Sequence, residues 1–296
     1  MIKVYNRKTK EYEIEKVAGG VLLEALYGNP LGRAGLELLV KRKFYSSLTG
    51  IACDSRISAR NITSFIKNLD IDMTTSASKA EDFKNFNEFF TRKLKKEARP
   101  FSEDRDELLS PGDGRLKAWT DIDMDSIMQI KGQTYSLGEL IRDNDLACRY
   151  NGGICILLRL APVDYHRFHF IDDGVCSKSK LIIGHYYSVN PVALNAIPKV
   201  FCQNKRECSV FSSESFGDII YMEVGATSVG SIIQTYEVGK PIKRGDEKGY
   251  FKFGGSTVIL FMEKGRAAID SGILKQTEMG YETRVLAGES IGNKIK

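Results

Sequence analysis

Residues 250–262 read Tyr250-Phe-Lys-Phe-Gly-Gly-Ser-Thr-Val-Ile-Leu-Phe-Met262, a Gly-Gly-Ser-Thr turn between two apolar runs. Both runs are short and rich in aromatic and β-branched residues, which is typical of β-strands. No lysine follows the serine and no helical pattern follows the turn, so the stretch does not match a phosphate-binding loop. It predicts two strands joined by a tight turn that carries Ser256.

The glycine before Ser256 makes a specific reaction possible at this turn. Gly255 has no Cβ beside its carbonyl, so a tight turn could hold the Ser256 hydroxyl against that carbonyl. Attack there would replace the amide with an ester, and it needs a base for the hydroxyl and donors for the developing oxyanion. An ordinary turn is the simpler interpretation, and the four residues alone do not decide between the two.

Short apolar runs bounded by glycine and proline fill the chain from about residue 105 onwards. Turn signals at Gly239-Lys-Pro241 and at 245–249 predict that the last strands pair locally as hairpins. We expect residues 101–296 to form one compact, mainly antiparallel β-rich domain. The predicted strands are 154–160, 180–187, 219–224, 229–236, 250–253 and 257–262.

The first third of the chain has a different pattern. Leucines recur at helical spacing on both sides of the break at Gly28-Asn-Pro30, and the cationic cluster Lys41-Arg-Lys43 follows. Residues 1–100 contain 19 Lys and Arg against 12 Asp and Glu, whereas the whole chain has a net charge of +5. We expect residues 1–100 to be mostly helical and basic, which gives an α+β fold overall.

A basic amphipathic segment suits an anionic surface, which could be lipid or nucleic acid. No groove-reading or base-stacking motif supports nucleic acid as the partner. A helix that packs on the core and exposes a solvated basic face is the alternative, and the pattern alone leaves it open.

Composition excludes several classes of protein. With 296 residues, 42% hydrophobic and 27% charged, the chain can bury a full core. Its longest apolar runs, 154–158 and 258–262, are far shorter than the roughly 18 to 20 residues that span a bilayer, and the start of the chain has no signal-peptide core. The six cysteines show no Cys-x-x-Cys pair and no zinc spacing with the three histidines, so we expect reduced cysteines, no metal and a cytosolic chain.

Two further segments contain the groups that a serine nucleophile needs. Ser110-Pro-Gly-Asp-Gly114 places Asp113 in a glycine-rich turn, and Ala161-Pro-Val-Asp-Tyr-His-Arg-Phe-His169 places His166 and His169 after an apolar strand. A nucleophile, a base and an orienting carboxylate are the elements of a catalytic triad. Packed histidines and an aspartate that supports its own turn are the simpler alternatives.

Together these segments resemble the phosphatidylserine decarboxylase family, over most of the chain and in the family's order. This sequence departs from the family at Gly254, where many members have leucine, and at Gly112, where many have valine. Neither departure removes a reacting group. The matching segments are Phe86-Asn-Glu-Phe-Phe-Thr-Arg-Lys-Leu94 with Ala98-Arg-Pro100, Ser110-Pro-Gly-Asp-Gly114, Asp164-Tyr-His-Arg-Phe-His169, Tyr187-Ser-Val-Asn-Pro191, Val224-Gly-Ala-Thr-Ser-Val-Gly-Ser231 and Phe253-Gly-Gly-Ser-Thr257.

The resemblance implies a zymogen that cuts itself between Gly255 and Ser256. Asp113, His169 and Ser256 would form the self-cleavage triad, in which His169 deprotonates the serine and Asp113 orients the imidazole. The products would be a large chain, 1–255, and a small chain that starts at Ser256. Elimination and loss of ammonia would turn Ser256 into a covalent pyruvoyl group, the implied cofactor. The two chains would stay together as a heterodimer, with further dimerisation left open.

The same resemblance implies a reaction and a location. The pyruvoyl ketone would form a Schiff base with the amine of phosphatidylserine and accept the electrons released as carbon dioxide leaves. His166 would assist by protonating the carbanion, and phosphatidylethanolamine would be released, a step of phospholipid biosynthesis. A lipid substrate strengthens the expectation that residues 1–100 bind an anionic membrane surface, with the β-rich catalytic domain held peripherally on the cytoplasmic side of the cell membrane.

Two other functions are compatible with the residues. A pyruvoyl-dependent decarboxylase of a soluble amino acid would use the same cofactor, but it would leave the basic first third unexplained. A non-catalytic β-rich binding module would have residues 254–257 as a plain hairpin turn.

Overall fold

The computed structural model describes residues 2–16, 43–130, 133–226, 231–254 and 256–295. The predicted helices before residue 42 and the glycine of the predicted cleavage site, Gly255, lie outside the described residues. Among the helices that are described, none combines the length and the apolar character needed to cross a membrane.

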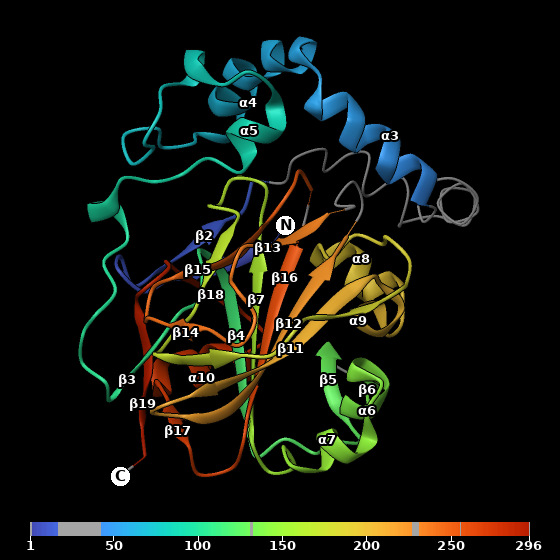
Figure 1. The fold of residues 1–296 in the computed structure, drawn as a ribbon, viewed down its shortest axis with the longest axis vertical. Helices are drawn as coiled ribbons and strands as arrows, with labels where there is room; N and C mark the ends of the chain where they lie inside the picture. Colours follow the sequence, from blue (N-terminus) through green and yellow to red (C-terminus); the bar gives the residue numbers. More distant parts are fainter. Residues whose placement is uncertain (1, 17–42, 131–132, 227–230, 255, 296) are drawn as a thin grey trace.

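A large sheet runs through the centre of the molecule (Figure 1). Its neighbouring strands are antiparallel, apart from the parallel pair of β1 with β18. In spatial order its strands are β14 (Pro241–Ile242), β9 (Gly174–Cys176), β11 (Arg206–Ser213), β12 (Gly217–Gly225), β16 (Ser256–Met262), β7 (Ile154–Leu160), β4 (Gly114–Thr120), β18 (Glu282–Val285), β1 (Lys3–Asn6) and β2 (Glu11–Ile14), and β10 (Lys180–Ile182) also pairs with β11.

Smaller sheets and short helices surround the large sheet. The sheets are β13 (Ile232–Gln234), β15 (Glu247–Phe251) and β8 (Arg167–His169); β17 (Ala267–Ile269), β19 (Ser290–Lys294) and β3 (Glu107–Leu109); and β5 (Ile127–Ile130) with β6 (Gln133–Tyr135). The α-helices are α3 (Lys43–Asp54), α4 (Ile62–Leu69), α5 (Phe86–Phe90), α6 (Leu137–Ile141), α7 (Asn144–Cys148), α8 (Pro191–Ala196), α9 (Val200–Gln203) and α10 (Ser271–Glu278). The 3₁₀ turns are η2 (Arg56–Asn61), η3 (Ala80–Asp82) and η4 (Lys96–Ala98).

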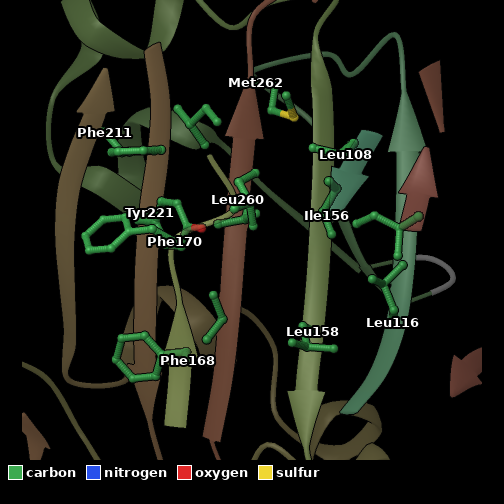
Figure 2. Packing of buried hydrophobic residues seen from close by; sticks show 14 of the residues in the cluster. Leu108, Leu116, Ile156, Leu158, Phe168, Phe170, Phe211, Tyr221, Leu260 and Met262 are labelled. Carbon is green, nitrogen blue, oxygen red and sulfur yellow. The ribbon is translucent and has the colours of Figure 1, made fainter. Parts of the chain in front are cut away.

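The central strands β7 and β16 are buried on both faces, which explains their continuous apolar sequences. Side chains alternate along a strand, so Ile156 and Leu260 enter one core and Leu157 and Phe261 enter the other. The first core is closed by the two three-stranded sheets and α10. Figure 2 shows part of this core, including the aromatic residues Phe168, Phe170, Phe211 and Tyr221. The second core is closed by α6 to α9.

A third apolar cluster joins α4 and α5 to the sheet. Its buried members include Phe86, Phe89 and Phe90 of α5, and Phe253, just before the predicted cleavage site, packs against them. These helices lie beyond one end of the central strands (Figure 1).

The prediction of a mainly antiparallel, β-rich fold is confirmed. Residues 3–14 differ from the expectation that residues 1–100 are mostly helical, because they form β1 and β2. β1 joins the main sheet by pairing with β18, near the other end of the chain. A local sequence pattern cannot predict a pairing with so distant a strand. The predicted boundary near residue 100 stays a prediction.

The prediction of local hairpins among the last strands is partly wrong. β13 does pair with β15, across the short β14. However, β15 and β16 lie in different sheets, and β16 pairs with β12 and β7. The segment between β15 and β16 therefore connects two different sheets, because β15 pairs with β13 and β8 whereas β16 pairs along its length with the long strands β12 and β7.

A buried ion network ties the start of the chain to this sheet. Arg159 of β7 donates to Glu15 at 2.9 and 3.0 Å and to Glu282 of β18 at 2.9 Å. Only 3% of Arg159 is exposed. Burial raises the pKa of Glu15, but the charges of Arg159 and Arg115 outweigh that effect and lower it. Glu15 and the two arginines, Arg115 and Arg159, are thus held in their charged forms.

We expect Arg159→Met to lower the free energy of unfolding by about 3 to 5 kcal/mol, because it leaves two buried carboxylates without their main partner. Urea denaturation in an uncleaved Ser256→Ala background would measure the change. Arg149 is a matched control, since it also binds two carboxylates, Asp218 and Glu263, but is about half exposed. Arg149→Met should change stability by about 1 kcal/mol or less. Equal losses in the two variants would contradict the importance assigned to burial.

Candidate active site

Ser256 is the first residue of β16 and is fully buried. It lies opposite Gly225 of β12 on one side and Leu160 of β7 on the other. Gly254 just before the junction has a φ of +136°, a conformation that favours glycine, so the departure from leucine at this position matches the local backbone. Because Gly255 lies outside the described residues, the distance from the hydroxyl to its carbonyl stays a prediction.

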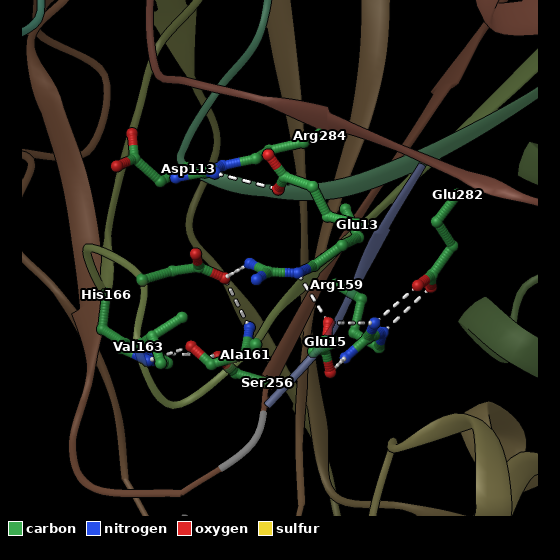
Figure 3. Close-up of polar contacts among 12 residues, drawn as sticks. Glu13, Glu15, Asp113, Arg159, Ala161, Val163, His166, Ser256, Glu282 and Arg284 are labelled. Carbon is green, nitrogen blue, oxygen red and sulfur yellow. Dashed lines mark hydrogen bonds and ion pairs between the residues drawn. The ribbon is translucent and has the colours of Figure 1, made fainter. Parts of the chain in front are cut away.

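His166 is the residue that meets the Ser256 hydroxyl. Its Nδ1 lies 3.4 Å from Ser256 Oγ, and its Nε2 lies 3.0 Å from the Ala161 carbonyl (Figure 3). A carbonyl oxygen only accepts, so Nε2 carries the proton and Nδ1 is free to accept one from the serine. Burial and, to a smaller extent, the charge of Arg92 lower the pKa of His166 to about 3, which keeps the ring neutral.

The loop that carries His166 is closed by Asp164. The Asp164 carboxylate accepts the Ala161 N–H at 2.7 Å and forms an ion pair with Arg115, while the Asp164 N–H donates to the Ala161 carbonyl at 2.9 Å. Arg115 in turn meets Glu15 at 2.6 Å. Because Glu15 also binds Arg159, the buried ion network fixes the turn from which His166 reaches Ser256.

Helix α5 holds the other side of the site. The Phe90 ring stacks on the His166 ring with centroids 3.9 Å apart. Asn87 accepts the Phe253 N–H at 2.9 Å, and the Phe253 ring packs edge-on against Phe86 and Phe90. Helix α5 therefore contacts both His166 and Phe253, which lies two residues before Gly255. Sequence reasoning identified this segment only as a family match, although its dense phenylalanines signalled a packing role.

His169 and Asp113 lie in neighbouring segments but make other contacts. The His169 N–H donates to the Pro111 carbonyl at 2.8 Å, which brings its strand against the aspartate turn. Its Nδ1 is 2.9 Å from the Gly245 carbonyl and therefore donates, and its Nε2 is 3.2 Å from the Tyr165 hydroxyl. Burial lowers the pKa of His169, although the Gly245 carbonyl and the charges of Glu247 and Asp113 oppose this change.

Asp113 is bound by Arg99. The guanidinium donates to both carboxylate oxygens, at 2.7 and 2.5 Å, and the Ala287 N–H donates to one of them at 2.9 Å. The described contacts therefore bring Ser256 together with His166, and leave the predicted triad of Asp113, His169 and Ser256 without direct hydrogen bonds among its members. The roles predicted for the two histidines stay predictions.

This geometry supports chemistry at the serine. Ser256 is shielded from water, its hydroxyl faces a neutral imidazole nitrogen, and apolar rings of α5 cover that imidazole. A ketone formed at this residue would stand in the same dry pocket beside His166, so the residues present fit a pyruvoyl group made from Ser256.

Comparison with known proteins agrees with the family suggested by the motifs. The sequence model of the phosphatidylserine decarboxylase family matches residues 86–293. A phosphatidylserine decarboxylase proenzyme of Ruminiclostridium cellulolyticum is 59% identical over 295 residues, which cover 100% of this chain and 98% of that protein. Proenzymes of the same name are 56% identical in Clostridium botulinum, over 99% of this chain and 100% of that protein, and 55% identical in Clostridium novyi, over 100% of both.

Proposed function

This chain belongs to the phosphatidylserine decarboxylase family, and we propose that it becomes active by cutting itself between Gly255 and Ser256 and converting Ser256 into a pyruvoyl group. It is a decarboxylase that converts phosphatidylserine to phosphatidylethanolamine and carbon dioxide. The observation that carries the proposal is the fully buried Ser256 hydroxyl, 3.4 Å from a neutral imidazole nitrogen of His166.

Self-cleavage starts with attack of Ser256 Oγ on the Gly255 carbonyl. In the role that the family resemblance implies, His169, supported by Asp113, would take the hydroxyl proton and pass it to the departing amide nitrogen; in the uncut structure these two residues are bonded to Gly245 and Arg99 instead. The C–N bond breaks and an ester to Ser256 forms. Loss of the α-proton then expels the Gly255 carboxylate and leaves dehydroalanine at the start of the small chain. One water replaces the nitrogen, which departs as ammonia.

Decarboxylation then takes place beside His166. A pyruvoyl group at residue 256 would supply an electrophilic ketone for the substrate amine and a sink for the electron pair released as carbon dioxide leaves. Nδ1 of His166 faces the reacting position with a free lone pair, so it can take a proton from the incoming amine and return one to the substrate carbon. Phe90 and the buried strands exclude water from this step.

The two chains stay together after the cut. Residues 256–295 supply β16, β17, α10, β18 and β19. Since β16 is hydrogen-bonded to β12 and β7 of the large chain on both sides, the small chain cannot leave without removing the central strand. The enzyme is therefore a heterodimer of chains from one precursor.

Mass spectrometry of the purified protein tests the proposal most directly. A piece that starts at residue 256, lacks a free amine, and has a mass lower than the serine form by one ammonia would support it. An active protein with one continuous chain would contradict it. A cut that leaves an amine-bearing serine would contradict the cofactor alone.

We also place the enzyme peripherally on the cytoplasmic face of the cell membrane. The cluster Lys41-Arg-Lys43 precedes or begins α3, and Ile51 of α3 and Ile57 of η2 are 66% and 71% exposed. Apolar side chains beside a basic cluster fit the headgroup region of an anionic bilayer.

Flotation with vesicles containing phosphatidylglycerol tests this placement. Replacing Lys41, Arg42 and Lys43 with glutamine should weaken binding by more than about tenfold, since each cation near the surface contributes about 1 kcal/mol. The matched control replaces the exposed lysines Lys240, Lys264 and Lys294 of the β-rich part, and it should bind like the parent. Equal binding of both triple variants would contradict the placement.

A further inference from the structure

A cavity of about 640 Å³ lies next to the candidate active site. Its lining includes Asp113, Asp164 and Tyr165 from the two segments predicted to carry the chemistry. Arg92, which follows α5, also lines it. The cavity is thus walled by the same loops that position His166.

Arg92 differs from the other described cations that line this cavity, each of which has a carboxylate partner. Only 5% of Arg92 is exposed, yet its Nε and Nη1 have no hydrogen-bond partner among the described residues. Its Nη2 reaches only the Val163 carbonyl, at 3.5 Å. The paired cations are Arg99 with Asp113, Arg115 with Asp164, Arg284 with Glu13, Lys16 with Asp70 and Lys8 with Glu289.

A buried guanidinium with unpaired N–H donors is unfavourable. This indicates that an anionic ligand binds Arg92. The charge persists in the buried site, because arginine stays protonated even though burial lowers the pKa of Arg92. The Phe89 ring lies 5.2 Å from the guanidinium carbon, and the charges of Asp113 and Asp164 act on Arg92 from beyond ion-pair distance, but none of these groups gives Nε and Nη1 a hydrogen-bond acceptor. The planar fork of guanidinium donors matches the oxygens of a carboxylate or a phosphate.

The position of Arg92 relates this anion to the substrate. Arg92 is close enough to His166 for its charge to lower the pKa of that imidazole. It also contacts Val163, which lies in the His166 loop (Figure 3). A head group that presents its amine to residue 256 beside His166 would therefore extend its remaining charges towards Arg92.

The phosphatidylserine head group has two anionic groups, a carboxylate and a phosphodiester. The reaction removes only the carboxylate. A guanidinium on the carboxylate would stabilise a charge that disappears as carbon dioxide leaves, and so would oppose the reaction. The phosphodiester keeps its charge from substrate to product. We infer that Arg92 binds the phosphodiester of the lipid head group and holds the serine part against residue 256, an inference that rests on the proposed function.

Arg92→Gln tests the inference, with Arg284→Gln as the matched control. Arg284 lines the same cavity but is half exposed and bound to Glu13. With a short-chain phosphatidylserine, Arg92→Gln should lower kcat/KM by about 10- to 100-fold, mainly through KM. Arg92→Lys should recover part of this loss, and Arg284→Gln should stay within about twofold of the parent.

L-Serine, which has the carboxylate but no phosphate, distinguishes carboxylate binding by Arg92 from phosphodiester binding. Reductive trapping of L-serine on the small chain should be equally efficient in Arg92→Gln and the parent. A loss of trapping as large as the loss with phosphatidylserine would overturn the assignment to the phosphodiester. An unchanged KM for phosphatidylserine would overturn it as well. Failure of the parent itself to trap L-serine would instead contradict the proposed pyruvoyl group.

A binding measurement covers the case in which Arg92→Gln is not processed. Glycerophosphoethanolamine has the phosphodiester and no carboxylate, and its affinity can be measured on uncleaved Ser256→Ala protein with and without Arg92→Gln. We expect an affinity at least about tenfold weaker without Arg92. Equal affinity of the two proteins would overturn the inference without any reference to cleavage or turnover.

Discussion

Ser256→Ala is expected to remain one uncut chain with no decarboxylase activity. The variant removes the hydroxyl that would attack the Gly255 carbonyl, and without the resulting ester there is no leaving group for the elimination that leads to the ketone. Side-chain volume changes little at this buried position, so the sheet around β16 should be retained. Denaturing electrophoresis reports the cut, and release of carbon dioxide from phosphatidylserine reports activity.

Thr257 provides the matched control for this experiment. It is the next residue of β16, it is equally buried, and its hydroxyl has no hydrogen-bond partner among the described residues. Thr257→Val removes this neighbouring hydroxyl at constant shape and should leave both cutting and activity intact. Activity from an uncut Ser256→Ala chain would refute the proposed origin of the electrophile.

The second prediction with a large expected effect distinguishes the roles of His166 and His169. His169→Ala should remain uncut, because the proposed base is lost. His166→Ala should still be cut but should decarboxylate about 10²- to 10⁴-fold more slowly, the usual effect of losing a positioned acid or base.

The measurement for the histidine variants is a time course of cutting followed by turnover of the processed fraction. The structure makes this comparison informative, since His166 rather than His169 contacts Ser256 Oγ. If His166→Ala stays uncut while His169→Ala is processed, the two roles are exchanged. Equal failure of processing in both variants would contradict any division of roles.

Much of the fold was predictable because its signals are local. Residues 154–158 of β7 and 258–262 of β16 are continuously apolar, as expected for strands buried on both faces. The turn carrying Asp113 and the loop carrying His166 were identified as candidates from short motifs, and the structure places His166 beside Ser256.

The parts that could not be predicted depend on distant partners. Residues 11–15 read Glu-Tyr-Glu-Ile-Glu, an alternating pattern that does not reveal the partners of Glu15, yet Glu15 binds Arg159 and Arg115 in the ion network beside the site. The pairing of Asp113 with Arg99 and of His169 with Gly245 follows from how loops meet in space, which spacing in the sequence does not reveal. The stacking of Phe90 on His166 is of the same kind.

The central place of β16 also sets the order of events in the life of the protein. The sheet must assemble while the polypeptide is continuous, since the strand that starts at the cut is flanked on both sides by the rest of the chain. Before the cut, folding is a unimolecular process; afterwards, recovery from denaturation requires two separate molecules to meet. If the chain matures as proposed, refolding of the precursor should not depend on protein concentration, whereas refolding of the cut enzyme should.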